Sequence, residues 1–473
     1  MKNSFYRIFF LPVIFLSIIL LVTGCTKTPN PAPTVVLPIV ATNQIIINLT
    51  GTTAESGGVV SSSGNGVITA NGVCYSPTDK TPTTADAKNS VAPVTGQIAN
   101  GQFSDTLKNL TPGTTYYLRA YATNSAGTSY GNVITFTTNA SSSSVVATVT
   151  TFAGNGAPGY VDASGLSAQF NNPQGVTVDS KGNLFVCDAY NNVIREITPG
   201  GVVSTFAGIQ AIGYVDGPAG SAQFYAPSGS VFDTQGNLYV ADFGNNVVRK
   251  ITPSGTVSTF AGTGVPGYKN GSVDSAHLKN ASDSLALFNG PQGLAVDAQN
   301  NIYVADRGNN VIRKISQAGR VVTVAGTKTA GFVDAGNENA SFKSPTGLVL
   351  DANGNIYVTD QGNSALRIIT PAGVVTTIIG GPLLTSLLNF PSAITIDKQG
   401  NLYIVDEGGR IFEYTTAKVL YLLAGTLNVT GLVNGAGAGA LFNDPQGIAI
   451  DASGNIYVAD QANNVIRKLV SSL

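Results

Sequence analysis

Short apolar runs, each bounded by Gly, Asn, Asp or Ser, recur at a regular spacing through the last two thirds of the chain. The repeated phrase reads P-x-G-x-x-x-D-x-x-G-N-L-Y-V-x-D-x-x-N-N-V-I-R. Its six copies begin at Pro173, Pro227, Pro291, Pro345, Pro391 and Pro445. Most neighbouring copies lie about 54 residues apart, with one longer and one shorter interval. A fixed period of this kind indicates a repeat architecture.

Each copy predicts four short strands, because apolar runs rich in Val, Ile and Tyr between turn residues are typical of strands. The first runs from P-x-G to the first Asp, the second is G-N-L-Y-V, the third V-I-R-K-I and the fourth V-x-T-x-A-G. This order places the D-x-x-N-N turns and the loops between repeats on one face of a β-propeller. We expect ligand sites on that face, since long loops carry most binding residues.

The two ends of the repeat region are complementary. Val149 to Gly154 copies the end of each repeat, whereas the last repeat stops at Leu473, just after its third strand. The first strand is therefore expected to complete the last sheet, which would close the ring and leave no open edge there.

Residues 34–138 predict a separate all-β unit. The stretch from Leu110 to Gly127 reads L-T-P-G-T-T-Y-Y-L-R-A-Y-A-T-N-S-A-G, and Tyr116, Leu118 and Ala120 fall on one face of a strand. This stretch resembles the fibronectin type III family pattern L-x-P-G-T-x-Y-x-x-R-x-x-A-x-N-x-x-G. The resemblance implies a small β-sandwich in which Tyr116 packs at a corner and hydrogen-bonds back to the backbone.

The longer phrase, with its P-x-G, G-N-L-Y-V-x-D and N-x-V-x-R parts, resembles the NHL repeat family over residues 146–473, and six copies imply a six-bladed propeller. Ala393 departs from this pattern where the other copies have Gly, and E-G-G-R at residues 407–410 replaces x-x-N-N. The predicted fold class is all-β: a fibronectin III-like β-sandwich followed by a six-bladed NHL β-propeller, closed by strand exchange between its ends.

The N-terminus carries a predicted export signal. Lys2 and Arg7 precede an apolar run from Phe9 to Val22, which is shorter than the roughly 20 residues of a spanning helix. The ending V-T-G-C at Cys25 resembles a bacterial lipobox, in which the cysteine is lipidated. We expect a lipoprotein signal peptide at 1–25, a Pro-rich spacer at 26–33 and a Ser-rich linker at 139–145.

These segments predict a protein held by its N-terminal lipid at the outer membrane or cell envelope, with the facing side of the membrane left open. The formal net charge of −1, with 11% charged residues, provides no basic surface for nucleic acid. After lipidation of Cys25, Cys74 and Cys187 remain, in different predicted domains, so the fold is not expected to depend on disulfides. We expect a monomer.

Two acidic series recur in the repeats. The first lies in D-x-x-G-N hairpin turns such as Asp179 to Asn183, where Gly takes positive φ and Asp caps backbone groups. The second comprises Asp188, Asp242, Asp306, Asp360, Asp406 and Asp460, followed seven residues later by Arg195, Arg249, Arg313, Arg367, Glu413 and Arg467. We predict a structural Asp-to-Arg or Asp-to-backbone role, with bound calcium as the alternative.

Residues that differ between otherwise identical repeats are free to serve recognition. The position after the second Asp and the position inside P-x-G both face the predicted mouth of the central channel. The candidate binding face is Gln174, Ala189, Ser228, Phe243, Gln292, Arg307, Thr346, Gln361, Ser392, Glu407, Gln446 and Gln461.

Catalytic interpretations have less support from the sequence. NHL-like lyases use a zinc site with several histidines, whereas this chain has only His277, in an inserted loop. We predict a non-catalytic, envelope-anchored scaffold that binds a protein or glycan partner and needs no cofactor. The alternative is a metal-dependent lactonase, other hydrolase or lyase at the channel mouth, with Gln361, Asp406 and Glu407 as its nearest acidic and amide groups.

Overall fold

The computed structural model describes residues 33–91, 101–140, 144–273, 285–381 and 387–471. Cys25, the predicted signal peptide and His277 lie outside these ranges. Within them, no helix is long and apolar enough to cross a membrane. The prediction of an all-β chain is confirmed, since the helices described are three-residue 3₁₀ turns. These turns are η1 (Gly165–Ser167), η2 (Ala189–Asn191), η3 (Phe243–Asn245), η5 (Arg307–Asn309), η6 (Asn337–Asn339), η7 (Gln361–Asn363) and η8 (Gln461–Asn463).

The N-terminal unit consists of two groups of paired strands. One contains β1 (Ile39–Thr42), β2 (Ile46–Ile47), β3 (Ala54–Ser62) and β6 (Gln102–Leu107). The other contains β4 (Ala70–Ser76), β5 (Ala87–Val91), β7 (Thr115–Asn124), β8 (Gly127–Tyr130) and β9 (Ile134–Thr137). On β7, Tyr116, Leu118 and Ala120 are buried as the alternation predicts, although Tyr121 is buried too. The Tyr116 hydroxyl accepts a hydrogen bond from the Thr111 N–H at 3.0 Å.

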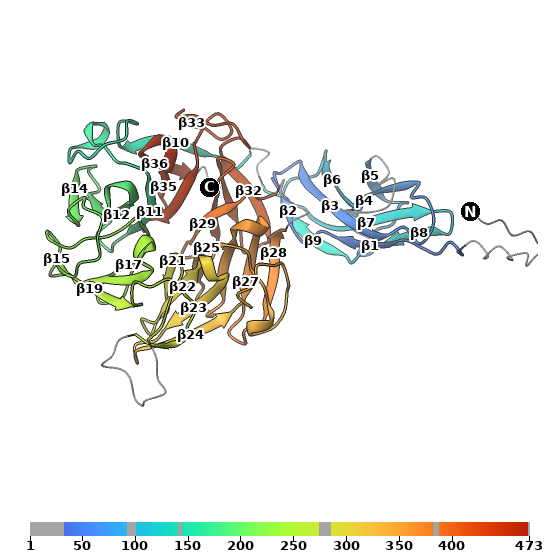
Figure 1. The fold of residues 1–473 in the computed structure, drawn as a ribbon. Coiled ribbons are helices and arrows are strands. Elements are labelled where there is room, and N and C mark those ends of the chain that lie inside the picture. The colour runs from blue at the N-terminus through green and yellow to red at the C-terminus, as the bar shows by residue number, and fades with distance from the viewer. Residues whose placement is uncertain (1–32, 92–100, 141–143, 274–284, 382–386, 472–473) are drawn as a thin grey trace, which may run out of the picture.

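Six antiparallel sheets follow, here named sheets 1 to 6 (Figure 1). Sheet 1 is β11 (Pro173–Val178), β12 (Leu184–Asp188), β13 (Val193–Ile197) and β14 (Val203–Ala207). Sheet 2 is β16 (Pro227–Phe232), β17 (Leu238–Asp242), β18 (Val247–Ile251) and β19 (Thr256–Ala261). Sheet 3 is β21 (Pro291–Val296), β22 (Ile302–Asp306), β23 (Val311–Ile315) and β24 (Arg320–Ala325).

The remaining sheets repeat this order. Sheet 4 is β25 (Pro345–Leu350), β26 (Ile356–Asp360), β27 (Ala365–Ile369) and β28 (Val375–Gly380). Sheet 5 is β29 (Pro391–Ile396), β30 (Leu402–Asp406), β31 (Arg410–Tyr414) and β32 (Val419–Ala424). Sheet 6 is β34 (Pro445–Ile450), β35 (Ile456–Asp460), β36 (Val465–Ser471) and β10 (Ala147–Ala153). Short strands β15 (Gly217–Pro218), β20 (Gly271–Ser272) and β33 (Gly435–Ala436) extend sheets 2, 3 and 6.

The innermost strands form a closed ring in which β11, β16, β21, β25, β29 and β34 each contact the next and β34 contacts β11. The Gly of P-x-G permits this close approach. A Cβ atom on Gly175 would lie 2.2 Å from the Ser228 carbonyl oxygen, and one on Gly447 would lie 2.1 Å from that of Gln174. Glycine is therefore required at these two junctions, whereas the fifth repeat has Ala393 in the same place.

The two ends of the repeat region meet in sheet 6 as the sequence predicts. Strand β10 pairs antiparallel with β36, from Ala147 opposite Ser471 to Ala153 opposite Ile466. The strand that follows the N-terminal unit thus forms the outer part of the last sheet, and the pairing covers an edge of β36 that would otherwise be open.

The N-terminal unit is joined to sheet 5 by strand pairing. Strand β2 runs parallel to β32, with Ile46 opposite Val419 and Ile47 opposite Leu420. At the same junction, the Asn139 carboxamide donates to the Tyr421 hydroxyl of β32 at 3.4 Å. Residues of both units share one buried apolar cluster. The two predicted domains therefore both contribute strands to one continuous eight-stranded sheet.

Candidate functional site: the channel mouth

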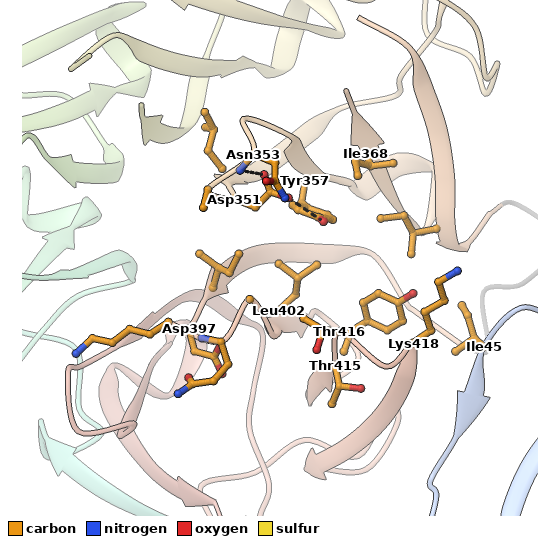
Figure 2. Close-up of a pocket in the computed structure, with 18 of the residues that line it drawn as sticks. Ile45, Asp351, Asn353, Tyr357, Ile368, Asp397, Leu402, Thr415, Thr416 and Lys418 are labelled. Atoms are coloured by element: carbon orange, nitrogen blue, oxygen red, sulfur yellow. Dashed lines mark hydrogen bonds between the residues drawn. The ribbon is translucent and has the colours of Figure 1, made fainter. Parts of the chain in front are cut away.

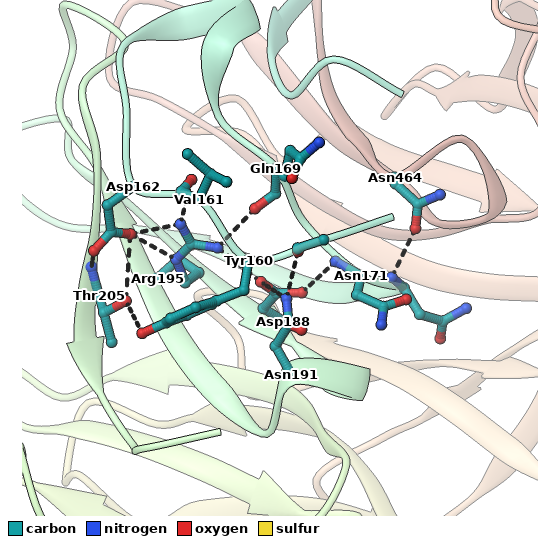
Figure 3. Close-up of polar contacts among 12 residues, drawn as sticks. Tyr160, Val161, Asp162, Gln169, Asn171, Asp188, Asn191, Arg195, Thr205 and Asn464 are labelled. Carbon is teal, nitrogen blue, oxygen red and sulfur yellow. Dashed lines mark hydrogen bonds and ion pairs between the residues drawn. The ribbon is translucent and has the colours of Figure 1, made fainter. Parts of the chain in front are cut away.

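A buried ion-pair network holds the turn between the second and third strands of sheet 1 (Figure 3). Arg195 Nη1 lies 2.9 Å from Asp188 Oδ2, and both side chains are fully buried. The Asn191 carboxamide donates to the same oxygen at 2.8 Å, and the Asn171 N–H donates to Oδ1 at 2.7 Å. The outer end of the guanidinium pairs with Asp162. Both carboxylate oxygens of Asp188 are thus committed to the framework.

The same pair recurs in sheets 2, 3, 4 and 6, each with 2.8 Å between nitrogen and oxygen: Arg249–Asp242, Arg313–Asp306, Arg367–Asp360 and Arg467–Asp460. The predicted structural role of this Asp series is confirmed for these sheets and sheet 1. A guanidinium occupies the place that a calcium ion would need, so these carboxylates do not fit calcium.

Sheet 5 differs from the seven-residue spacing that the sequence suggested. Three residues separate Asp406 from Arg410, whereas four separate Asp360 from Ala365. Phe412 consequently stands opposite Ile404, in the register that Arg367 occupies opposite Val358. The assignment of Glu413 to the arginine series is therefore wrong. Arg410 supplies the cation instead, with 2.6 Å between its Nη2 and Asp406 Oδ2, and its guanidinium packs over the Phe412 ring.

The two asparagines of N-N have separate tasks. The first, such as Asn191, binds the buried Asp. The second, Asn192, takes a left-handed conformation at φ 55°, and its side chain accepts the Ala226 N–H of sheet 2 at 3.0 Å. Equivalent bonds join Asn246 to Gly290, Asn310 to Ser344 and Asn464 to Asn172. These four turns, in sheets 1, 2, 3 and 6, are thereby tied to the next sheet. In sheets 2, 3 and 6 this fixes the residue directly after the Asp at the channel mouth.

A cavity of about 230 Å³ opens at this mouth, lined by Gln174, Phe243, Gln292, Arg307, Gln361, Glu407, Gln446 and Gln461. All eight belong to the predicted binding face. Ser228, Thr346 and Ser392 line a narrower cavity of about 80 Å³ along the inner strands, together with three of the same glutamines. Ala189 is fully buried and lines neither cavity. The structure therefore brings together most of the predicted residues, and their role in binding stays a prediction.

Polar side chains of sheets 3 to 6 form a connected network at the mouth. Arg307 Nη2 donates to Gln361 Oε1 at 3.0 Å, and Gln361 in turn donates to Glu407 Oε1. Gln446 donates to the same Glu407 oxygen at 3.1 Å and to Asp444 Oδ1 at 2.7 Å. The side-chain oxygen of Gln292, by contrast, is buried and has no hydrogen-bond partner among the described residues. A buried carbonyl oxygen without a donor is unusual in a folded protein and can accept from a ligand.

The electrostatics of the mouth depend on Glu407. Burial raises the pKa of Glu407 above its ordinary value, while the hydrogen bond from Gln446 opposes this increase and the charge of Asp444 adds to it. Nearby Arg307 supplies the compensating positive charge. The mouth thus offers one carboxylate, one guanidinium, five carboxamides and the ring of Phe243.

The mouth does not fit a metal centre. In the part of the chain that the structure describes, no three His, Cys, Asp or Glu side chains lie together so as to hold a metal ion. Calcium requires about six to eight oxygen ligands, usually including several carboxylates. Burial raises the pKa of Cys74 to about 11 and that of Cys187 to about 12, so these two thiols stay protonated at neutral pH.

Two mouth residues were missed at the sequence level. Asp444 and Asn172 accept hydrogen bonds from Gln446 and Gln461, and each directly precedes the repeated Pro. The residue in this place differs in every repeat: Asn172, Ala226, Gly290, Ser344, Phe390 and Asp444, all with positive φ. A comparison of the repeats at this position, like that made for the residue after the second Asp and the residue inside P-x-G, would have identified Asn172 and Asp444.

A larger cavity of about 850 Å³ lies between sheets 4 and 5 beside Ile45 of the N-terminal unit (Figure 2). Its polar groups belong to the repeated hairpin turns. Asp351 accepts hydrogen bonds from the Asn353 N–H at 2.9 Å and from the Tyr357 hydroxyl at 3.4 Å. Ile368 contributes an apolar wall. The mouth, where polar groups converge from different sheets, is therefore the stronger candidate site.

Comparison with known proteins supports the repeat assignment. The NHL repeat family model matches residues 170–195, 288–315, 342–369 and 442–469. The chain is 28% identical over 348 residues to NHL repeat-containing protein 2 of Bos taurus. This alignment covers 66% of this chain and 40% of that protein. It is 27% identical over 278 residues to the chloroplastic protein SUPPRESSOR OF QUENCHING 1 of Arabidopsis thaliana, covering 46% of this chain and 26% of that protein.

A crystal structure of a protein of unknown function from Bacteroides thetaiotaomicron aligns with a TM-score of 0.52 at 16% identity, over 92% of this chain and 98% of that one. At this identity the similarity concerns the fold alone. The matched regions cover less than half of the two curated relatives, so the activities of those whole proteins do not transfer. The chain carries NHL repeats in an all-β, propeller-like fold.

Proposed function

We propose that this chain is a non-catalytic binding scaffold that recognises a protein or glycan partner at the mouth of a six-bladed NHL propeller. One observation carries the proposal: residues that differ between repeats converge on one cavity, while the residues that hold them are repeated. Arg195, Asn191 and their counterparts fix the turns, and Gln361, Glu407 and Phe243 vary at the tips of those turns. A repeated frame with variable tips is suited to recognition.

The chemistry of the mouth favours a polar ligand. Carboxamides both donate and accept hydrogen bonds, so the five glutamines can match hydroxyl or amide groups in several orientations. The Phe243 ring adds an apolar face on which a sugar ring or an apolar side chain can pack. The unpartnered Gln292 oxygen needs a donor, which either class of ligand can supply.

The same proposal includes the N-terminal third of the chain. A lipidated Cys25 would hold the protein at the outer membrane or cell envelope, and the fibronectin III-like unit would separate the propeller from the membrane. Hydrogen bonding of the Tyr116 hydroxyl to the Thr111 N–H supports this description of the N-terminal unit. Anchoring is tested with Cys25→Ser, which should move the chain from the membrane fraction to the soluble fraction of its host.

The binding function is tested with glycan arrays and envelope pull-downs of the full chain. A double variant, Arg307→Ala with Gln361→Ala, should weaken capture of the partner by about tenfold or more, as expected for central contact residues. The matched control is Ser180→Ala with Gln299→Ala, in exposed hairpin turns of sheets 1 and 3 at the far ends of the strands. Equal capture by the double variant and the unchanged chain would contradict the proposal.

A further inference from the structure

A second group of polar residues lines a groove of about 770 Å³ between sheets 5 and 6, away from the mouth. Its walls include the two D-x-x-G-N turns that begin at Asp397 and Asp451. Tyr403 and Glu413, from neighbouring strands of sheet 5, complete the wall on that side. The proposed function makes no use of this groove.

Glu413 is an incompletely satisfied acid in this wall. Glu413 is 1% exposed, and its Oε2 has no hydrogen-bond partner among the described residues. Oε1 lies 3.4 Å from the Tyr403 hydroxyl, which also lies 3.2 Å from Asp397 Oδ2. A phenol has one proton to donate, so it can satisfy only one of these two carboxylates at a time.

The other sheets show which group completes this arrangement. In sheet 3, Lys314 stands opposite Tyr303 in the register that Glu413 has opposite Tyr403. The Lys314 ammonium lies 3.2 Å from Asp297 Oδ2 and 4.9 Å from the centre of the Tyr303 ring. Lysines occupy the same position over Tyr239 in sheet 2 and Tyr457 in sheet 6. An ammonium between a tyrosine face and a carboxylate gains from both contacts.

Sheet 5 keeps the acceptors of this arrangement and lacks its cation. Asp397 and Tyr403 match Asp297 and Tyr303, whereas a carboxylate replaces the lysine. Sheet 4 differs from both, because Ile368 stands opposite Tyr357 at the lysine position and provides neither a cation nor a second acid. Lys398 also lines the groove, but within the described residues its ammonium makes no ion pair with Asp397 or Glu413.

We propose that the groove between sheets 5 and 6 binds a primary ammonium group supplied from outside the chain, either a free alkylamine or the lysine side chain of a partner. The ammonium lies over the Tyr403 ring and donates to Asp397 and Glu413. It thus takes the position that Lys314 fills in sheet 3.

The test is a titration of the full chain with n-butylammonium chloride, followed through the NMR signals of ¹³C-labelled tyrosine rings, with Tyr403→Phe to assign Tyr403. The expected result is a saturable shift of the Tyr403 signals that n-butanol, a neutral analogue, does not cause. Glu413→Lys rebuilds the arrangement of sheet 3 and should weaken the amine by about tenfold or more. Glu196→Lys is the matched control, since it has the same register in sheet 1 opposite Phe185 and should leave the shift unchanged.

A capped peptide with a single lysine distinguishes the two sources. Tighter binding of the peptide than of n-butylammonium indicates a partner lysine, and the reverse order indicates a free amine; both support the site. The proposal is overturned if neither probe shifts Tyr403, or if calcium chloride gives the same shift at lower concentration. It is also overturned if Asp397→Asn and Glu413→Gln, which keep the side-chain shapes, both bind n-butylammonium as tightly as the unchanged chain.

Discussion

Sheets 4 and 5 are neighbours with the same strand order, yet their buried polar groups are arranged differently. In sheet 4, Arg367 pairs with Asp360 from the middle of the third strand and packs against Phe342. In sheet 5 the cation, Arg410, comes from the start of the third strand, and a phenylalanine stands at the arginine position. The ring stacked on the guanidinium has moved with it, from the loop before the sheet to Phe412.

This comparison shows that the fold requires a cation beside the buried Asp and an aromatic ring against the cation, and not a particular residue in a particular place. Sheet 5 satisfies that requirement with a turn one residue shorter. It is also the sheet that receives β2 of the N-terminal unit and that places Glu407 at the mouth and Glu413 in the groove. The most divergent repeat thus carries several features that the other repeats lack.

The largest effect is expected from removing the cation of sheet 4. Arg367→Met would leave Asp360 buried without a charge partner and would also remove the hydrogen bonds that Arg367 donates to Asp334 and to the Val333 carbonyl. Breaking a fully buried pair costs about 3–5 kcal/mol. Arg410→Met should cost less, because Arg410 is 7% exposed whereas Arg367 is fully buried, so water can better replace the lost cation in sheet 5. Urea unfolding of both variants measures the difference, and equal losses would mean that the two networks are energetically equivalent.

The repeats made most of the fold predictable. The strand order within each sheet and the pairing of β10 with β36 follow from runs such as Val149 to Ala153 that match the ends of other repeats. The mouth residues were predictable for the same reason: Gln361 and Glu407 differ between repeats at a position whose neighbours do not.

Two features were not predicted: the length of one local turn, and a strand pairing between segments distant in sequence. The sequence shows the departure E-G-G-R after Asp406, but a count of seven residues presupposes a constant turn length and so leads to Glu413; the pairing of β30 with β31 shows the register that results. The pairing of β2 with β32 was also missed. Ile46 and Ile47 have an ordinary strand pattern, and nothing in that pattern identifies Val419 as the partner.

The second largest effect concerns the acid of sheet 5 and depends on pH. Burial raises the pKa of Glu413 to about 7, and the charge of Asp397 adds to the increase. Between its ordinary pKa and about pH 7, the folded chain keeps a proton that the unfolded chain has released. This contribution to stability is therefore present at low pH and is lost as the pH rises through that range.

Glu413→Gln removes the titrating group and keeps its shape. The variant should be more stable than the unchanged chain at pH 8, by up to about 3 kcal/mol for a shift of this size, and should lose the advantage near pH 4. Thermal unfolding of the variant and of the unchanged chain at a series of pH values measures this difference in stability. Glu196→Gln in sheet 1 is the control and should show a smaller effect, because Glu196 is more exposed and lies near Lys181. A pH-independent difference for Glu413→Gln would show that its carboxyl group is not the one that titrates.

The smallest effect is expected where the inner strands meet. A Cβ on Gly175 would lie 2.2 Å from the Ser228 carbonyl oxygen of sheet 2, whereas one on Gly347 would approach sheet 5 no closer than 2.9 Å, at the Ala393 Cα. Gly175→Ala should therefore destabilise the fold by about 1–3 kcal/mol, the usual cost of overpacking, and Gly347→Ala by less. Urea midpoints of the two variants provide the comparison. This expectation assumes that the fifth repeat tolerates Ala393 because the inner strands of sheets 4 and 5 lie further apart. A larger loss of stability for Gly347→Ala than for Gly175→Ala would contradict it.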